Sequence, residues 1–145
     1  MEAAGPWVPG LLAAVETRLA EIGAAHGARL AEHAGATIAA GGKRLRPLLV
    51  LVAAGSAPQA PGGLVRGGVA VELVHSATLV HDDVLDAAPV RRGRPTVWAS
   101  AGRAAATAAG DVLFAAAFSE LARNDRADEI RALSRAGSAL AVGEL

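Results

Sequence analysis

Apolar residues recur at spacings of three and four along most of the chain, which is the period of an amphipathic α-helix. The stripe is clearest between Leu64 and Asp86, where its members are Val65, Val69, Leu73, Ala77, Val80 and Val84. No segment alternates as a β-strand would, and no internal repeat is visible. The pattern predicts helices over residues 11–40 with a break near Gly27, 47–54, 64–86, 103–123 and 127–145, and loops over 55–63 and 87–95.

The composition indicates one globular, helix-rich domain. The 145 residues can bury a core, and 52% of them are hydrophobic. The 14 basic and 14 acidic residues cancel, so nothing favours a nucleic-acid or anionic-membrane binder. The absence of cysteine excludes disulfides and thiolate sites and fits a reducing cytoplasm, where we expect the protein. The N-terminus does not read as a signal peptide, and the longest strongly apolar run, 48–54, is too short for a transmembrane segment.

Three acidic residues end the predicted 64–86 helix: Asp82, Asp83 and Asp86. Asp82 and Asp86 lie one turn apart on one face, with roughly 6 Å between their side-chain bases. Two carboxylates this close repel each other unless a cation lies between them, and Mg²⁺ takes carboxylate oxygens together with substrate phosphates. His75 lies only about 20° from the azimuth of Asp82. The alternative interpretation is a solvated acidic helix end, because such acid pairs are common.

Two short segments concentrate the positive charge. Residues 91–94 follow the acidic helix end directly, where cations offset the unfavourable interaction of acids with the helix dipole and arginines grip phosphate oxygens in pairs. Residues 41–47 join two predicted helices, and their glycines let the backbone approach an anion; the alternative there is a solvated basic turn. No strand or P-loop pattern precedes them. Together the segments indicate two polyanionic ligands. Their cations are Lys43, Arg44, Arg46, Arg91, Arg92 and Arg94.

Three motifs in series resemble those of the trans-isoprenyl diphosphate synthases, or polyprenyl synthetases. They are Gly-Gly-Lys-Arg-Leu-Arg-Pro at 41–47, Glu-Leu-Val-His-Ser-Ala-Thr-Leu-Val-His-Asp-Asp-Val-Leu-Asp at 72–86 and Arg-Arg-Gly-Arg-Pro-Thr at 91–96, followed by Gly-Asp at 110–111. Each motif is weak alone, but the series is highly specific. The resemblance implies an all-α fold, an antiparallel helical bundle of the isoprenoid synthase type, with residues 1–145 as the N-terminal half of one truncated domain.

The resemblance also implies roles for individual residues. Asp82 and Asp86 are similar to the family aspartates that bind Mg²⁺ bridging to the allylic diphosphate, and Asp83 supports them as a direct or indirect ligand. Arg91 is similar to the arginine that holds the allylic diphosphate. Asp82, Asp86 and Arg91 are therefore the catalytic candidates. The residues that resemble the isopentenyl diphosphate site are Lys43, Arg46, His75 and Arg92.

The implied reaction ionises the allylic diphosphate, adds the isopentenyl double bond to the resulting cation and removes a proton. Metal and arginine stabilise the leaving diphosphate, and apolar helices keep water from the cation. Ala77 and Thr78 are small where bulky aromatics block elongation in the family, so we expect a product longer than farnesyl diphosphate. Phe114 or Phe118 would form a deeper floor.

Four further side chains have expected places. Arg44 and Arg94 are expected to be field-setting or surface charges, and His81 is expected to be structural. Asp111 either bonds an arginine of the site or is an exposed helical acid.

The sequence departs from the family in lacking its second aspartate-rich motif and the Lys-Thr pair that binds with it, while residues 142–145 resemble the start of a family Gly-Glu-x-x-Gln segment. We therefore expect an incomplete catalyst with exposed apolar faces, which oligomerises as a homodimer or with a complementing second-half chain. Three interpretations stay open: a fragment of a synthase, one subunit of a split synthase, or a non-catalytic diphosphate-binding partner. A class I terpene cyclase would share the DDxxD motif but would not need the Lys43, Arg46 and Arg92 set.

Overall fold

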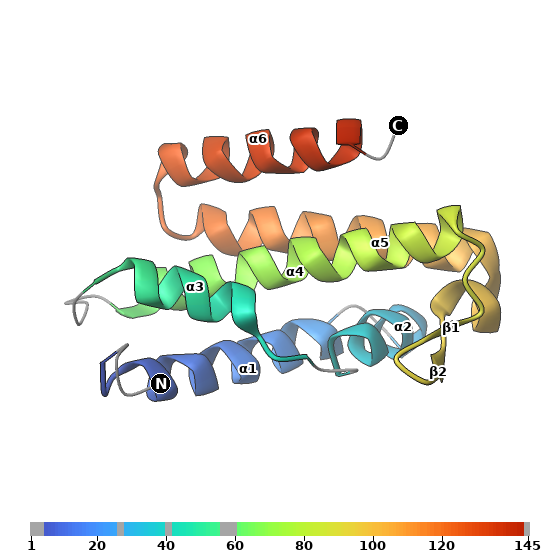
Figure 1. Cartoon of the computed structure of the whole chain (residues 1–145), viewed down its shortest axis with the longest axis horizontal. Helices are drawn as coiled ribbons and strands as arrows, with labels where there is room; N and C mark the ends of the chain where they lie inside the picture. Colours follow the sequence, from blue (N-terminus) through green and yellow to red (C-terminus); the bar gives the residue numbers. More distant parts are fainter. Residues whose placement is uncertain (1–4, 26–27, 40–41, 56–60, 144–145) are drawn as a thin grey trace.

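The computed structural model describes residues 5–25, 28–39, 42–55 and 61–143, and the side chains of 28–31 are left aside. Within these residues it is an all-α bundle, as predicted, with one short hairpin (Figure 1). Gly27, Gly41 and the Glu144–Leu145 end of the last predicted helix lie outside them. The elements are α1 (Val8–Ala24), α2 (Ala28–Ala39), α3 (Leu45–Ala53), α4 (Pro61–Leu85), β1 (Val90–Arg91), β2 (Arg94–Pro95), α5 (Val97–Ala122) and α6 (Ala127–Gly143).

Two long helices, α4 and α5, lie side by side through the middle of the bundle (Figure 1). Helices α1, α2 and α3 cover one side of this pair, and α6 returns along the other side against α5. Glycine permits the closest approach: a Cβ at Gly110 would overlap the His81 ring, and one at Gly68 would lie 3.1 Å from Val15. The chain therefore brings the C-terminus of α4 and the hairpin to one end of the bundle, beside α2.

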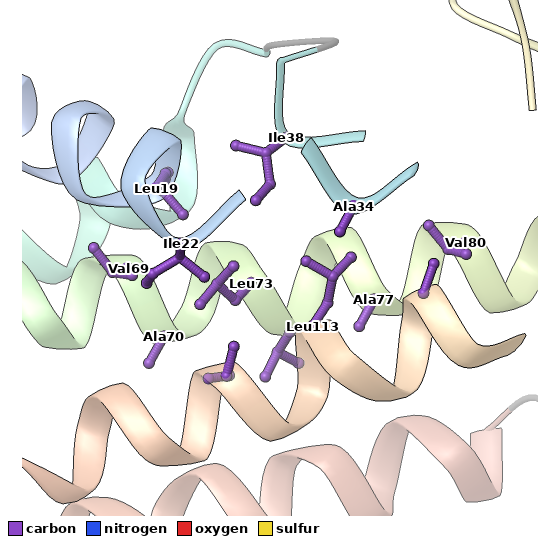
Figure 2. Close-up of a cluster of buried hydrophobic side chains, with 14 of the residues drawn as sticks. Leu19, Ile22, Ala34, Ile38, Val69, Ala70, Leu73, Ala77, Val80 and Leu113 are labelled. Atoms are coloured by element: carbon purple, nitrogen blue, oxygen red, sulfur yellow. The ribbon is translucent and has the colours of Figure 1, made fainter. Parts of the chain in front are cut away.

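The core lies where α1, α2, α4 and α5 meet (Figure 2). Val69, Leu73 and Ala77 from the predicted α4 stripe are fully buried there. Burial of each leucine or valine contributes about 1.5–3 kcal/mol. Other members of this cluster are Leu19, Ile22, Ala34, Ile38, Ala70, Val80 and Leu113.

The helices lie where the sequence predicted them, but several begin earlier than predicted. The predicted 11–40 helix is two helices, so the expected break is confirmed, and α1 begins earlier, at Val8. Helix α3 begins at Leu45, before the buried Pro47 that was expected to open it. Helix α5 begins at Val97 rather than 103, and Gly102 interrupts its helical geometry with φ 84°.

The predicted 87–95 loop contains a β-hairpin, so the expectation of no strands was wrong here. Val90 pairs with Pro95 and Arg91 with Arg94 in antiparallel register. Arg92 and Gly93 connect the strands with φ values of 50° and 76°, the positive values that a two-residue type I′ turn requires. Strands of two residues are too short to show alternation, and Gly93 was the available signal.

Apolar side chains also lie on the surface, as expected. Leu45, Leu49 and Val52 form an exposed stripe along α3. Separately, α4 and α5 are long and apolar enough to cross a membrane by length and composition alone, although 50% and 44% of their most apolar windows are buried in the bundle. The absence of a transmembrane segment therefore stays a prediction, which the central packing of both helices supports.

Candidate diphosphate-binding site

Helix α4 ends at its aspartates in a Schellman motif. The Asp86 N–H donates to the Asp82 carbonyl at 2.8 Å, and the Ala88 N–H donates to the Asp83 carbonyl at 3.0 Å. Ala87 takes the left-handed conformation that this motif needs, with φ 48°. Asp82 and Asp86 therefore follow each other by one helical turn at the helix end. Asp82 is half-buried and Asp86 is exposed.

Asp83 differs from its two neighbours because it is buried. Its Oδ1 accepts a charged hydrogen bond from Arg91 Nε at 2.7 Å. This bond ties the hairpin to the last turn of α4. Whether Asp83 acts as a direct or an indirect metal ligand stays a prediction.

The acidic end is suited to a shared metal rather than to a closed protein cage. Among the described residues, no group of three or more histidine, aspartate or glutamate side chains is placed to hold a metal ion. Mg²⁺ needs only one or two carboxylates when substrate phosphates complete its coordination. Asp82 and Asp86 supply a donor set of that kind.

Thr96 closes the base of the hairpin. Its buried hydroxyl donates to the Ala88 carbonyl at 2.6 Å and accepts from the Ala99 N–H at 3.1 Å, so it also caps α5. The hairpin is thereby fixed between α4 and α5, and a small hollow of about 100 Å³ lies beside it. The hollow is lined by Ala36, Thr37, Leu79, Asp83, Arg91, Arg92, Arg94, Pro95, Thr96 and Val97.

A larger pocket of about 440 Å³ contains all four residues predicted for isopentenyl diphosphate: Lys43, Arg46, His75 and Arg92. They come from three segments that are distant in sequence. The guanidinium of Arg92 lies over Gly42, with Nη1 only 3.2 Å from where a Cβ would be. The absence of a side chain at residue 42 therefore lets the two basic segments meet. Gly42, Arg44, Leu45 and Glu72 complete the lining.

The electrostatics of this pocket favour an anion. Burial is the main cause that lowers the pKa of His75 below its usual 6.5, with the positive charges of Arg46 and Arg92 acting in the same direction and Glu72 opposing them. His75 is therefore neutral at pH 7 and can donate an N–H to a phosphate oxygen.

Arg44 corrects the sequence prediction. It was expected to be a field-setting or surface charge, but its side chain is only 9% exposed and pairs with Glu72 at 2.8 Å and Glu16 at 2.5 Å. It also donates to the Ile38 carbonyl at 3.0 Å. Neither Glu72 nor Thr96 was recognised as part of the site. The available signals were an acid three residues before His75 and a threonine directly before an apolar helix.

Asp111 does not bond an arginine of the site. Its carboxylate is 68% exposed and lies 3.3 Å from the His81 ring, so the alternative of an exposed helical acid holds. The same ring stacks on Phe114 at 5.8 Å and fills the space beside Gly110, which agrees with the structural role expected for His81. Arg94 is exposed, as expected.

The chain-length candidates have unequal surroundings. Ala77 is fully buried in the α4–α5 core (Figure 2), whereas Thr78 is half-buried and its hydroxyl donates to the His75 carbonyl at 2.8 Å. Phe114 and Phe118 pack partly buried against the core. The prediction of a long product stays a prediction.

Comparison with known proteins assigns the family. The polyprenyl synthetase family model matches residues 28–145, so the chain belongs to this family. It is 39% identical over 103 residues to a short chain isoprenyl diphosphate synthase of Methanothermobacter thermautotrophicus, covering 71% of this chain and 31% of the relative. It is 42% identical over 123 residues to heptaprenyl diphosphate synthase component 2 of Geobacillus stearothermophilus, covering 83% and 38%. The chain thus spans about a third of these relatives.

Solved structures agree with the fold. A decaprenyl diphosphate synthase from Rhodobacter capsulatus superimposes with a TM-score of 0.87 and 34% identity, covering 99% of this chain and 44% of that one. A polyprenyl synthase from Caulobacter crescentus, complexed with calcium and isoprenyl diphosphate, gives a TM-score of 0.88 and 34% identity over 94% of this chain and 42% of that one. The family uses a divalent metal.

Proposed function

We propose that this chain provides the diphosphate-binding half of a polyprenyl diphosphate synthase, which joins isopentenyl diphosphate to an allylic prenyl diphosphate. One observation carries the proposal: Lys43, Arg46, His75 and Arg92 converge in one pocket, and Arg92 also lines the hollow that contains Asp83 at the end of α4. Three cations gathered around one pocket are suited to a polyanion. We expect the protein in the cytoplasm, where both substrates would be dissolved.

The allylic diphosphate binds at the aspartate end. Asp82 and Asp86 would hold Mg²⁺, which neutralises the leaving diphosphate when bound. Arg91 is 36% exposed, and within the described part of the chain it bonds Asp83 through Nε, so its guanidinium retains N–H groups for phosphate oxygens. Asp83 keeps this guanidinium at the site by anchoring its Nε. Charge that develops on the diphosphate during ionisation is therefore met by groups already in place.

The isopentenyl diphosphate binds in the larger pocket. Lys43, Arg46 and Arg92 balance its charge, and neutral His75 donates a hydrogen bond. The double bond of this ligand would then attack the allylic carbon beside the α4 end. Ala77 and Thr78 are small where bulky aromatics block elongation in the family, which supports a product longer than farnesyl diphosphate.

The chain spans about a third of the relatives that it matches. Its residues supply the first aspartate-rich segment, and we expect turnover to need the second one of the family as well. The Geobacillus relative is named a component of its synthase, and this name favours a second candidate function, a partner subunit of a heteromeric enzyme.

The proposal is tested by ligand binding before turnover. Calorimetry should show farnesyl diphosphate binding in magnesium buffer, and the Asp82→Ala/Asp86→Ala double variant should weaken it by about 100-fold, since two charge-assisted contacts are lost. Arg91→Ala should weaken it about tenfold. The matched control Asp111→Ala removes an exposed helical acid and should leave the affinity unchanged.

Turnover separates the two candidate functions. A mixture of this chain, Mg²⁺, both diphosphates and a chain with the second-half segment of a relative should produce prenyl diphosphates, whereas omission of the second chain should abolish product. If the complete mixture forms no prenyl diphosphate, the result would favour the second candidate function, that of a partner subunit. Unchanged farnesyl diphosphate affinity in the double aspartate variant would contradict both candidates.

A further inference from the structure

Arg44 joins three helices through one guanidinium. Its Nε and Nη2 donate to Glu16 of α1 at 2.5 and 3.2 Å, and its Nη1 donates to Glu72 of α4 at 2.8 Å. The same Nη2 donates to the Ile38 carbonyl at the end of α2. The side chain thus points into the bundle while its neighbours Lys43 and Arg46 are exposed at the pocket.

The backbone at Arg44 is held in an unfavourable shape. Its φ of 46° and ψ of 38° are left-handed, a conformation that a residue with a Cβ rarely adopts. No side-chain cap bonds the start of α3 at this position. Left-handed geometry persists at such residues only where surrounding contacts impose it. The buried bonds of the guanidinium are contacts of that kind.

Glu72 is the inner end of this arrangement. Its residue is 5% exposed, its Oε1 accepts from Arg44, and its Oε2 has no hydrogen-bond partner among the described residues. Glu72 lines the same pocket as His75, which lies three residues further along α4. A buried carboxylate with one orphan oxygen is costly for stability alone. A carboxylate kept beside a ligand pocket is better explained by what it holds in position.

We propose that Arg44 and Glu72 are positioning residues for the isopentenyl diphosphate subsite: their buried ion pair holds the 42–46 turn so that Lys43 and Arg46 stand at the pocket beside His75. This inference rests on the proposed function, because it gives the turn a ligand to serve. Both residues line the pocket, but their charges are already paired with each other. Loss of the Arg44–Glu72 pair should therefore release the turn and displace Lys43 and Arg46. The affinity for isopentenyl diphosphate should fall, and the affinity for the allylic diphosphate should not.

Trypsin tests the turn without any ligand. The bonds after Lys43 and Arg44 are trypsin sites, and Glu72→Gln leaves both unchanged while it removes the charge that holds Arg44. Cleavage at these bonds, mapped by mass spectrometry on the full chain, should be about tenfold faster in Glu72→Gln, because cleavage needs the turn to open. Glu16→Gln is the matched control: it bonds the same guanidinium from an exposed position, and cleavage should change less than about threefold.

Calorimetry then tests positioning. Glu72→Gln should weaken the affinity for isopentenyl diphosphate by about tenfold. The affinity for farnesyl diphosphate in the presence of Mg²⁺ should change by less than about twofold. Arg44→Gly should behave alike, because glycine accepts the left-handed turn but lacks the guanidinium, whereas Arg44→Lys should recover part of the affinity.

The outcomes separate the two ideas. Equal weakening of both ligands, or unchanged cleavage together with unchanged isopentenyl diphosphate affinity in Glu72→Gln, would show an ordinary packing interaction and overturn the inference. A wild-type chain that binds neither diphosphate overturns the proposed function instead, and the cleavage comparison still reports on the turn.

Discussion

In each of the two basic segments of this protein, an arginine pairs with a buried acid of α4, but the two arginines are buried to different degrees. In the 42–46 turn, Arg44 is 9% exposed and is bonded to two acids and a carbonyl. In the 90–95 hairpin, Arg91 is 36% exposed and pairs with one acid, Asp83, among the described residues. Each segment therefore carries one inward arginine anchored by a buried carboxylate of α4, with more exposed cations beside it. Both segments also contain a residue with a positive φ. In the turn it is Arg44 itself, and in the hairpin it is Arg92, which follows Arg91.

The difference shows which arginine is free to serve a ligand. All three nitrogens of the Arg44 guanidinium are engaged inside the bundle, so this residue lines the pocket with its charge already paired. Among the described residues, Arg91 donates to Asp83 from its Nε, and its side chain stays partly exposed. Two arginines in similar sequence contexts thus have different uses, which only their burial distinguishes.

The largest expected effect contrasts the two anchors directly. Arg44→Ala should lower the free energy of unfolding by about 3–5 kcal/mol, because it leaves the buried Glu72 carboxylate unpaired. Arg91→Ala should lower it by about 1.5–3 kcal/mol, since water reaches Asp83 once the partly exposed guanidinium is gone. Urea unfolding measures both, and the exposed Arg94→Ala control should stay within about 0.5 kcal/mol. Equal losses for Arg44→Ala and Arg91→Ala would remove the distinction.

A smaller effect separates backbone from side-chain demands in the two segments. Gly93 has φ 76° and open space around its Cβ position, so Gly93→Ala should destabilise the hairpin by about 1 kcal/mol through backbone strain alone. The added methyl group of Gly42→Ala would instead meet the Arg92 guanidinium. This variant should therefore change the free energy of unfolding little and weaken the affinity for isopentenyl diphosphate about threefold. Unfolding and calorimetry on both variants check the contrast, which fails if Gly42→Ala is the more destabilising.

The smallest effect is the pH response of the pocket. Because the folded-state pKa of His75 lies below 6.5, the unfolded chain binds more protons there, and stability is lost as pH falls below about 6.5. The groups that act on the ring are Arg46, Arg92, Arg91 and Glu72. His75→Asn should lose less stability than wild type between pH 7.5 and 5.5 by urea unfolding. A steeper loss in the variant would contradict this sign.

Much of the fold was predictable because long apolar stripes dominate it. The α4 stripe predicted buried Val69, Leu73 and Ala77 correctly, and the break between α1 and α2 followed from glycine. The hairpin was missed because two-residue strands carry no period. The early start of α5 was missed because its first turn is separated from the rest by Gly102, where the apolar pattern restarts.

The site was predictable as a set of residues but not as a set of partners. Sequence order placed Lys43, Arg46, His75 and Arg92 together only through the family resemblance, and their convergence depends on Gly42 and the hairpin turn. Arg44 was misjudged because charge in a basic run looks the same whether it is solvated or buried. Its partners Glu16 and Glu72 lie in other helices, where no local spacing marks them.

Arg92 has a further consequence, because its side chain lines both the hollow beside Arg91 and the larger pocket. A ligand bound in either space would contact Arg92, so the side chain of Arg92 would separate the two ligands. Their binding free energies cannot then be independent, and thermodynamic linkage makes the influence reciprocal. Under the proposed function, each diphosphate would therefore change the affinity for the other.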